Sequence, residues 1–253
     1  MNVLKADFFR FFKDKTTYIL LGIIFLLPPL SCIMYGMSSG GEFTAEVIVF
    51  KGLGTDILCA VLGLLFSMFF GKEYSNNTIR NKLCYGENRY KIAACFFLES
   101  VVITLIFAAV SMVSSLIFGS VFGSFVFGSE FFPKLFCQLA IIIAFSILIT
   151  AVVVSSKNMK AGFMVTLMIS VIFTAISYAL PSLAVKYSVA ETVCRALYMV
   201  VSTMLISSVD GVYYVGADFV FDNIYANAIV LSVVYIVLSV GITMFAVKKQ
   251  SYK

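Results

Sequence analysis

The sequence predicts an all-α integral membrane protein that forms a single domain over residues 1–253. Hydrophobic residues make up 61% of the chain, charged residues make up 12%, and the mean hydropathy is +1.04. Soluble globular domains carry about 25% charged residues, so this composition excludes an ordinary soluble fold. The apolar residues gather in runs of the length that a membrane-spanning helix needs, about 20 residues.

The first expected element is an amphipathic helix over residues 2–14. At helical spacing Leu4, Phe8, Phe11 and Phe12 share one face, and the charged residues, Asp7 included, fall largely elsewhere. The segment is too polar to cross a bilayer. We expect it to lie in the membrane interface, with its phenylalanines at the acyl boundary and its basic residues at the headgroups.

Six spanning helices are predicted to follow. Their expected ranges are 18–35, 55–70, 92–118, 135–154, 161–180 and 226–247. The first contains Pro28 and Pro29, which remove two backbone donors and should bend it. Along the third, small residues recur every four positions and let another helix approach closely. These helix-packing residues are Ser111, Ser115, Gly119 and Gly123.

A further apolar stretch at 193–209 could be counted as a seventh span, but the basic residues favour six. With six spans, most of the 18 lysines and arginines fall on one side, which the positive-inside rule assigns to the cytoplasm. Both termini and residues 71–91 are then cytoplasmic in a multi-pass protein of the cell membrane. Residues 187–209 are expected to form an outer re-entrant or interfacial hairpin.

The longest polar interruption of the apolar pattern is residues 71–91, between the second and third spans. We expect a short helix there, ended by Gly86, with Ile79 and Leu83 on one face. Arg80, Lys82 and neighbouring basic residues surround this apolar ridge. The pattern favours docking to another protein, and headgroup binding is the alternative.

Glu99 is the one ionisable residue well inside a predicted span, ~12 Å along the helix from Lys91. An unpaired charge there is costly, so the carboxyl must be paired, protonated or in a wet cavity. A structural role and a substrate, ion or coupling role both remain open.

The sequence offers no readable catalytic or cofactor site. It contains no histidine, the commonest metal ligand, and Gly71-Lys72 is followed by Glu73 where a phosphate-binding loop needs a hydroxyl. The basic residues form short scattered clusters, which argues against nucleic acid as a partner. We expect neither enzymatic activity nor a metal or other cofactor bound by this chain.

The polar segment also resembles a known family, the membrane-spanning permeases of type-2 ATP-binding-cassette (ABC) exporters. The pattern E…TIRN-L-G-R is typical of small bacterial members related to bacitracin-resistance and lantibiotic-immunity transporters. The matching residues are Glu73, Thr78, Ile79, Arg80, Asn81, Leu83, Gly86 and Arg89.

This resemblance implies a coupling mechanism. Residues 2–14 would be the elbow helix, 75–86 the cytoplasmic coupling helix and 187–209 the half-helices before the last span. Two permease chains, in a homodimer or a heterodimer, would pair with separate ATPase subunits that bind ATP and Mg. Ile79 and Leu83 would sit in a cleft of the ATPase. Arg80 and Lys82 would pair with acidic groups at the rim of that cleft. The same contact would include Glu73, Thr78 and Arg89.

The expected substrate is an amphipathic peptide, antibiotic or lipid-like molecule moved out of a bacterial cell, because the spans are rich in phenylalanine and no large soluble domain is present. This would fit antimicrobial peptide resistance. Two other classes stay open: an ATPase-independent secondary transporter or channel that uses Glu99, and a membrane-embedded enzyme or immunity protein.

Overall fold

The computed structural model describes a helical chain. It covers residues 2–38, 45–52, 55–76, 78–86, 88–124, 128, 131–156, 158–184, 187, 189, 192–193 and 224–249. The labelled helices are α1 (Asn2–Lys13), α2 (Lys15–Ser38), α3 (Ala45–Gly52), α4 (Thr55–Ser75), α5 (Thr78–Cys84), α6 (Arg89–Phe122), α7 (Phe131–Ser156), α8 (Met159–Ala184) and α11 (Ile224–Lys249).

Five of the described helices are long and apolar enough to cross a membrane. Their apolar segments are Lys15–Ile33, Leu58–Ser75, Arg89–Phe122, Phe131–Ser156 and Tyr225–Phe245. The prediction of a helical chain with several apolar helices of membrane-spanning length is therefore confirmed for the described residues. The fifth predicted span falls in α8, whose described apolar segment is the shorter Met159–Ile169, so the count of six stays a prediction. The predicted outer hairpin at 187–209 lies mostly outside the described residues.

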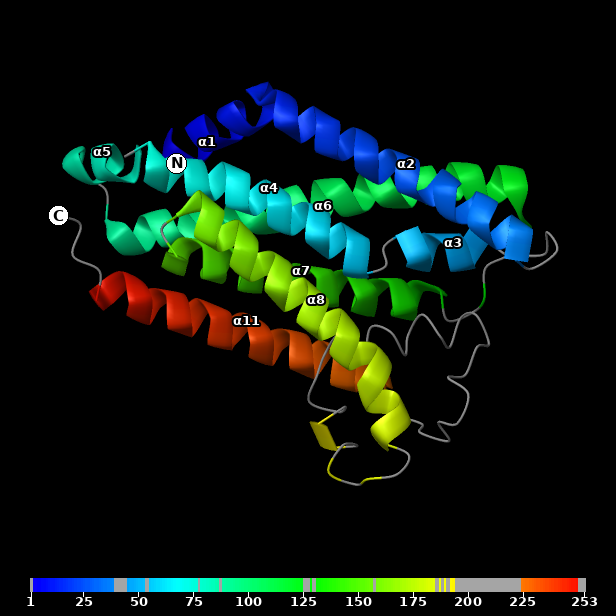
Figure 1. Ribbon diagram of the computed structural model, residues 1–253. Coiled ribbons are helices and arrows are strands. Elements are labelled where there is room, and N and C mark those ends of the chain that lie inside the picture. Colours follow the sequence, from blue (N-terminus) through cyan, green and yellow to red (C-terminus); the bar gives the residue numbers. More distant parts are fainter. Residues whose placement is uncertain are drawn as a thin grey trace.

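The long helices run back and forth between the two ends of an elongated bundle (Figure 1). One end carries α1, α5 and the last turns of α11, and the other end carries α3. The chain turns sharply between α1 and α2 at Asp14, whose carboxylate accepts a hydrogen bond from the Thr16 N–H, an N-cap arrangement. The Thr17 hydroxyl donates to the Phe11 carbonyl across the same corner at 3.0 Å. These bonds fix α1 at an angle to the first span.

Close helix contacts depend on small residues. A Cβ added to Gly71 of α4 would lie 2.6 Å from the Cα of Met159 in α8, so the two backbones can meet only at a glycine. Of the four predicted packing residues in α6, Ser111, Ser115 and Gly119 are buried. Gly119 lies against Ala45 of α3, where a Cβ would come within 3.1 Å of the Ala45 Cα. Gly123 is half-buried and caps the helix, donating its N–H to the Gly119 carbonyl.

Pro29 of α2 creates a hydrogen-bonding deficit that α6 corrects. Pro29 has no N–H to give to the carbonyl of Phe25, four residues earlier. Ser114 of α6 instead donates its hydroxyl to that carbonyl at 2.6 Å. A carbonyl without a donor in a membrane interior costs several kcal/mol. The bond from Ser114 offsets the cost of Pro29 inside a spanning helix, and it forms only when α2 packs on α6.

We predict that Ser114→Ala lowers the free energy of unfolding by about 1 kcal/mol, within the range measured for hydrogen bonds between membrane helices. In a Pro29→Ala background the same change should cost much less, because the new N–H at position 29 serves the Phe25 carbonyl. Thermal unfolding in detergent of both single variants and the double variant measures this difference. Ser120→Ala, which removes an exposed hydroxyl of α6, is the matched control. Equal losses from Ser114→Ala in both backgrounds would contradict the assignment.

Candidate functional site

The segment between the second and third spans folds as the seven-residue helix α5. It ends near Gly86, whose backbone φ of +84° lies in the left-handed region that glycine adopts without steric cost. The Gly86 N–H donates to the Leu83 carbonyl, which closes the last turn. Asn77 and Glu87, which flank this unit, lie outside the described residues.

Lys82 joins α5 to two other helices through a buried ion network. Its ammonium donates to Asp7 Oδ2 of α1 and to Glu73 Oε2 of α4, each at 2.7 Å. Arg10 of α1 places Nη1 at 2.8 Å from Glu73 Oε1, an ion pair without the alignment of a hydrogen bond, and at 3.5 Å from Asp7 Oδ1. Both carboxylates are buried. Three segments of the chain therefore meet at one group of charges.

These charges are costly to bury and are held because they compensate one another. Burial alone would lower the pKa of the Lys82 ammonium, but the Glu73 charge and the hydrogen bonds to Asp7 and Glu73 raise that pKa above its usual value. Lys82 therefore stays charged at neutral pH. Removing one partner would leave a buried charge uncompensated, which costs far more than an exposed ion pair contributes.

Glu99 extends this cluster from α6. Its side chain is 1% exposed, and its carboxyl group faces that of Asp7 in α1. Asp7, Lys82 and Glu73 are its electrostatic neighbours. Three carboxyl groups thus face the two cations Arg10 and Lys82, and the charges balance when one carboxyl holds a proton.

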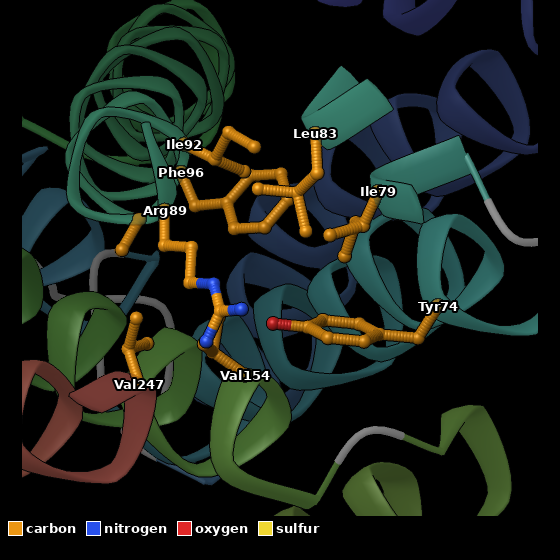
Figure 2. Close-up of a pocket in the computed structure, with 9 residues that line it drawn as sticks. Tyr74, Ile79, Leu83, Arg89, Ile92, Phe96, Val154 and Val247 are labelled. Carbon is orange, nitrogen blue, oxygen red and sulfur yellow. The ribbon is translucent and has the colours of Figure 1, made fainter. Parts of the chain in front are cut away.

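The apolar side of α5 packs on the chain's own core. Figure 2 shows Ile79 and Leu83 directed toward Phe96 and Ile92 of α6, around a narrow cavity that Tyr74 also lines. Ile79 is only 3% exposed. Arg89 enters the cavity from the first turn of α6, and its guanidinium group points toward the Tyr74 hydroxyl (Figure 2).

Three side chains that the sequence analysis assigned to the partner contact lie against the chain's own helices. Ile79, Leu83 and Lys82 were predicted to face a partner, but all three point into the chain itself. A short helix at the end of a bundle buries its apolar ridge against the nearest apolar surface, which here is α6. The outward side of α5 instead presents Arg80, Asn81 and Cys84, and Tyr85 in the turn that follows is 89% exposed. Thr78 is half-buried at the helix start.

The orientation of α1 also differs from the prediction. Phe11 is fully buried, with its ring 5.7 Å from that of Phe69 in α4, and Leu4 and Phe8 are half-buried. Asp7, predicted to lie off the apolar face, lies one turn before Phe11 on the same inward side. Phe12 is exposed, as is Phe9. One side of α1 therefore binds protein, and only the other is available to lipid.

Sequence reasoning missed Asp7, Arg10, Tyr74 and Tyr85 as members of this site. One sequence signal pointed to Asp7. It lies four positions before Phe11 and so shares its helix face, and a carboxylate on a face that buries an aromatic ring needs a compensating cation. In the part of the chain that the structure describes, no group of three or more histidine, cysteine or acidic side chains could hold a metal ion.

Comparison with known proteins gives one match. A family model described as ABC-2 family transporter protein matches residues 3–177, from α1 into α8. No curated protein sequence matches the chain.

We predict that Lys82→Met lowers the free energy of unfolding by about 3–5 kcal/mol, because it leaves Asp7 and Glu73 buried with only Arg10 to compensate them. Adding Glu73→Gln to Lys82→Met should recover part of this loss, because it removes one of the two uncompensated charges. Thermal unfolding in detergent measures both effects. Lys15→Met, at an exposed position of α2, is the control and should change stability by less than about 0.5 kcal/mol. Similar losses for Lys82→Met and Lys15→Met would show that the network does not stabilise the fold.

Proposed function

The chain belongs to the ABC-2 family of transporter proteins, and from this premise we propose that it is the permease subunit of an ABC exporter driven by a separate ATPase subunit. Family membership alone does not give the direction of transport, the ATPase partner or the residues that couple to it, and these three belong to the proposal. ATP and Mg would be bound by the partner, and this chain would carry no enzymatic activity of its own.

The observation that carries the proposal is the two-sided placement of α5. Its outer side exposes Arg80, and the turn after it exposes Tyr85, at the end of the bundle. Its inner side is fixed to α1 and α4 by Lys82 and to α6 by Ile79 and Leu83. A partner that pushes on the outer side must therefore move several helices together.

The proposed mechanism is alternating access. Closure of the ATPase subunits on ATP would displace α5, and the 2.7 Å bonds of Lys82 would make α1 and α4 follow as one body. The 34 residues of α6 give it a length of about 50 Å, which would carry the displacement from this end of the bundle to the other. A second permease chain, identical or different, would complete the transport path.

The partner contact is proposed for the outer side of α5. Tyrosine and arginine are the residue types that contribute most at protein interfaces, and Arg80 and Tyr85 would dock with the ATPase. Ile79, Leu83, Lys82 and Glu73 would transmit the motion from inside. Thr78 and Arg89 would position the two ends of this unit.

The substrate is proposed to be an amphipathic peptide, antibiotic or lipid-like molecule. The TIRN-L-G-R residues support the bacitracin-resistance and lantibiotic-immunity branch, and the phenylalanine-rich spans suit an amphipathic cargo. The positive-inside bias supports the placement of both termini in the cytoplasm, and the resemblance to small bacterial permeases implies a bacterial cell membrane.

Glu99 supports a second candidate, an ATPase-independent transporter. A buried carboxyl inside a spanning helix, close to other ionisable groups, is a common feature of proton and ion pathways. In this function Glu99 would load and release a proton during each cycle.

The first proposal predicts that an ATPase co-purifies with the tagged chain from its native membrane in mild detergent. Arg80→Glu combined with Tyr85→Ala should reduce the recovered ATPase at least tenfold at an unchanged membrane level of the chain. Quantitative mass spectrometry measures this ratio. Lys5→Glu, at an exposed position of α1, is the control and should keep the ATPase bound. If no ATPase is recovered even after gentle crosslinking, the exporter proposal fails.

The second candidate predicts proton flux by the purified chain in vesicles that contain no ATPase. A pH-sensitive dye inside the vesicles reports this flux under an applied membrane potential. The exporter proposal expects no flux above that of empty vesicles. Flux that is present in the parent and lost in Glu99→Gln would favour the second candidate.

A further inference from the structure

A cavity of about 480 Å³ lies between α1 and α4, and Arg10, which also contacts Glu73 of the ion network, is part of its lining. Its lining includes the basic side chains of Arg10, Lys13 and Lys72 and the amide of Asn76. None of the proposed coupling contacts uses Lys13, Lys72 or Asn76. The cavity is open to the surroundings, so a ligand can reach it.

The charges of this cavity favour an anion. Arg10 is already balanced within the ion network, so the cavity's own charges are Lys13 and Lys72 against one carboxylate, that of Asp14, whose Oδ2 lies 3.3 Å from Lys72 Nζ. Burial opposes ionisation of Asp14, but the hydrogen bonds from Thr16 and the Lys72 ammonium hold its pKa below the usual value, so Asp14 is charged at neutral pH. An excess of positive charge remains, with amide and ammonium donors of the kind that bind phosphate oxygens.

The border of the cavity is apolar and exposed. Phe9, which lines it, is 68% exposed, and its ring lies 5.8 Å from the Lys13 ammonium. Phe12, Tyr18 and Ile19 continue this exposed apolar surface across the corner between α1 and α2. A small soluble anion would gain nothing from these side chains, whereas an acyl chain would cover them.

We propose that this cavity binds the phosphate headgroup of an anionic phospholipid, whose acyl chains lie along Phe9, Phe12 and the start of α2. Basic pockets beside membrane helices bind such headgroups. The bound lipid would hold α1 against α4 at the corner where Asp14 separates α1 from the first span. This inference does not depend on the proposed exporter function, and its test measures lipid binding alone.

The test is native mass spectrometry of the purified full-length chain in detergent, titrated with phosphatidylglycerol. The parent should retain one tightly bound phosphatidylglycerol molecule and should bind phosphatidylcholine, which has no net charge, at least tenfold more weakly. Lys13→Gln combined with Lys72→Gln should weaken phosphatidylglycerol binding about 30-fold, because each basic residue near an anionic lipid contributes roughly a factor of five. Lys5→Gln combined with Lys15→Gln removes two exposed charges outside the cavity and should change binding less than threefold.

Asp14→Asn should strengthen phosphatidylglycerol binding, whereas the lysine substitutions should weaken it. It removes the one negative charge of the cavity and should tighten phosphatidylglycerol binding about fivefold. The asparagine oxygen can still accept the Thr16 N–H, so the corner between α1 and α2 is preserved. A role of these residues in folding alone would predict no gain in lipid binding.

Three results would overturn the proposal. One is equal binding of phosphatidylglycerol and phosphatidylcholine, and another is equal loss of binding in the cavity and control variants. The third is binding of glycerol phosphate as tight as that of the intact lipid, which would identify the ligand as a soluble phosphate. Thermal unfolding of each variant checks that a loss of lipid binding does not come from a loss of fold.

Discussion

The ammonium group of Lys82 is the constraint on which the end of the bundle that carries α1 and α5 depends. It bonds Asp7 and Glu73 at 2.7 Å and thereby connects residues 75 positions apart in the sequence. Asp7 and Glu73 would each be destabilising in this buried position without a cation. Because α1, α4 and α5 each supply one part of the charge balance, none of the three can leave the others without exposing an uncompensated charge to an apolar interior.

This arrangement explains why a helix of only seven residues has a defined position. Such a helix is unstable alone, since helix formation in water needs about 12–15 residues even for favourable sequences. Ile79 and Leu83 add apolar burial against α6, and Gly86 ends the helix without strain. The geometry of α5 is thus determined by its contacts with the bundle, and its outward residues Arg80 and Tyr85 are displayed from a fixed base.

The sequence predicts the helical class, the apolar segments and the short helix after the second span, because each depends on local periodicity or composition. It does not predict which side of α5 faces inward. Ile79 and Leu83 share a face of α5 whichever way that face points. Whether the face contacts the chain's own core or a partner depends on the position of α6, which the local sequence does not give. Asp7 was missed for a related reason: its pairing with Lys82 bridges 75 residues, and periodicity carries no information at that distance.

The bond between Ser114 and the Phe25 carbonyl imposes an order on biosynthesis. The two residues are 89 positions apart, so the first span emerges from the ribosome well before its hydrogen-bond donor is made. At translation rates of about 5–20 residues per second, this interval is roughly 5–20 s. During that time the carbonyl that Pro29 leaves without a donor must be hydrated or held by the insertion machinery. The first span therefore reaches its final depth and bend in the bilayer only when the third arrives.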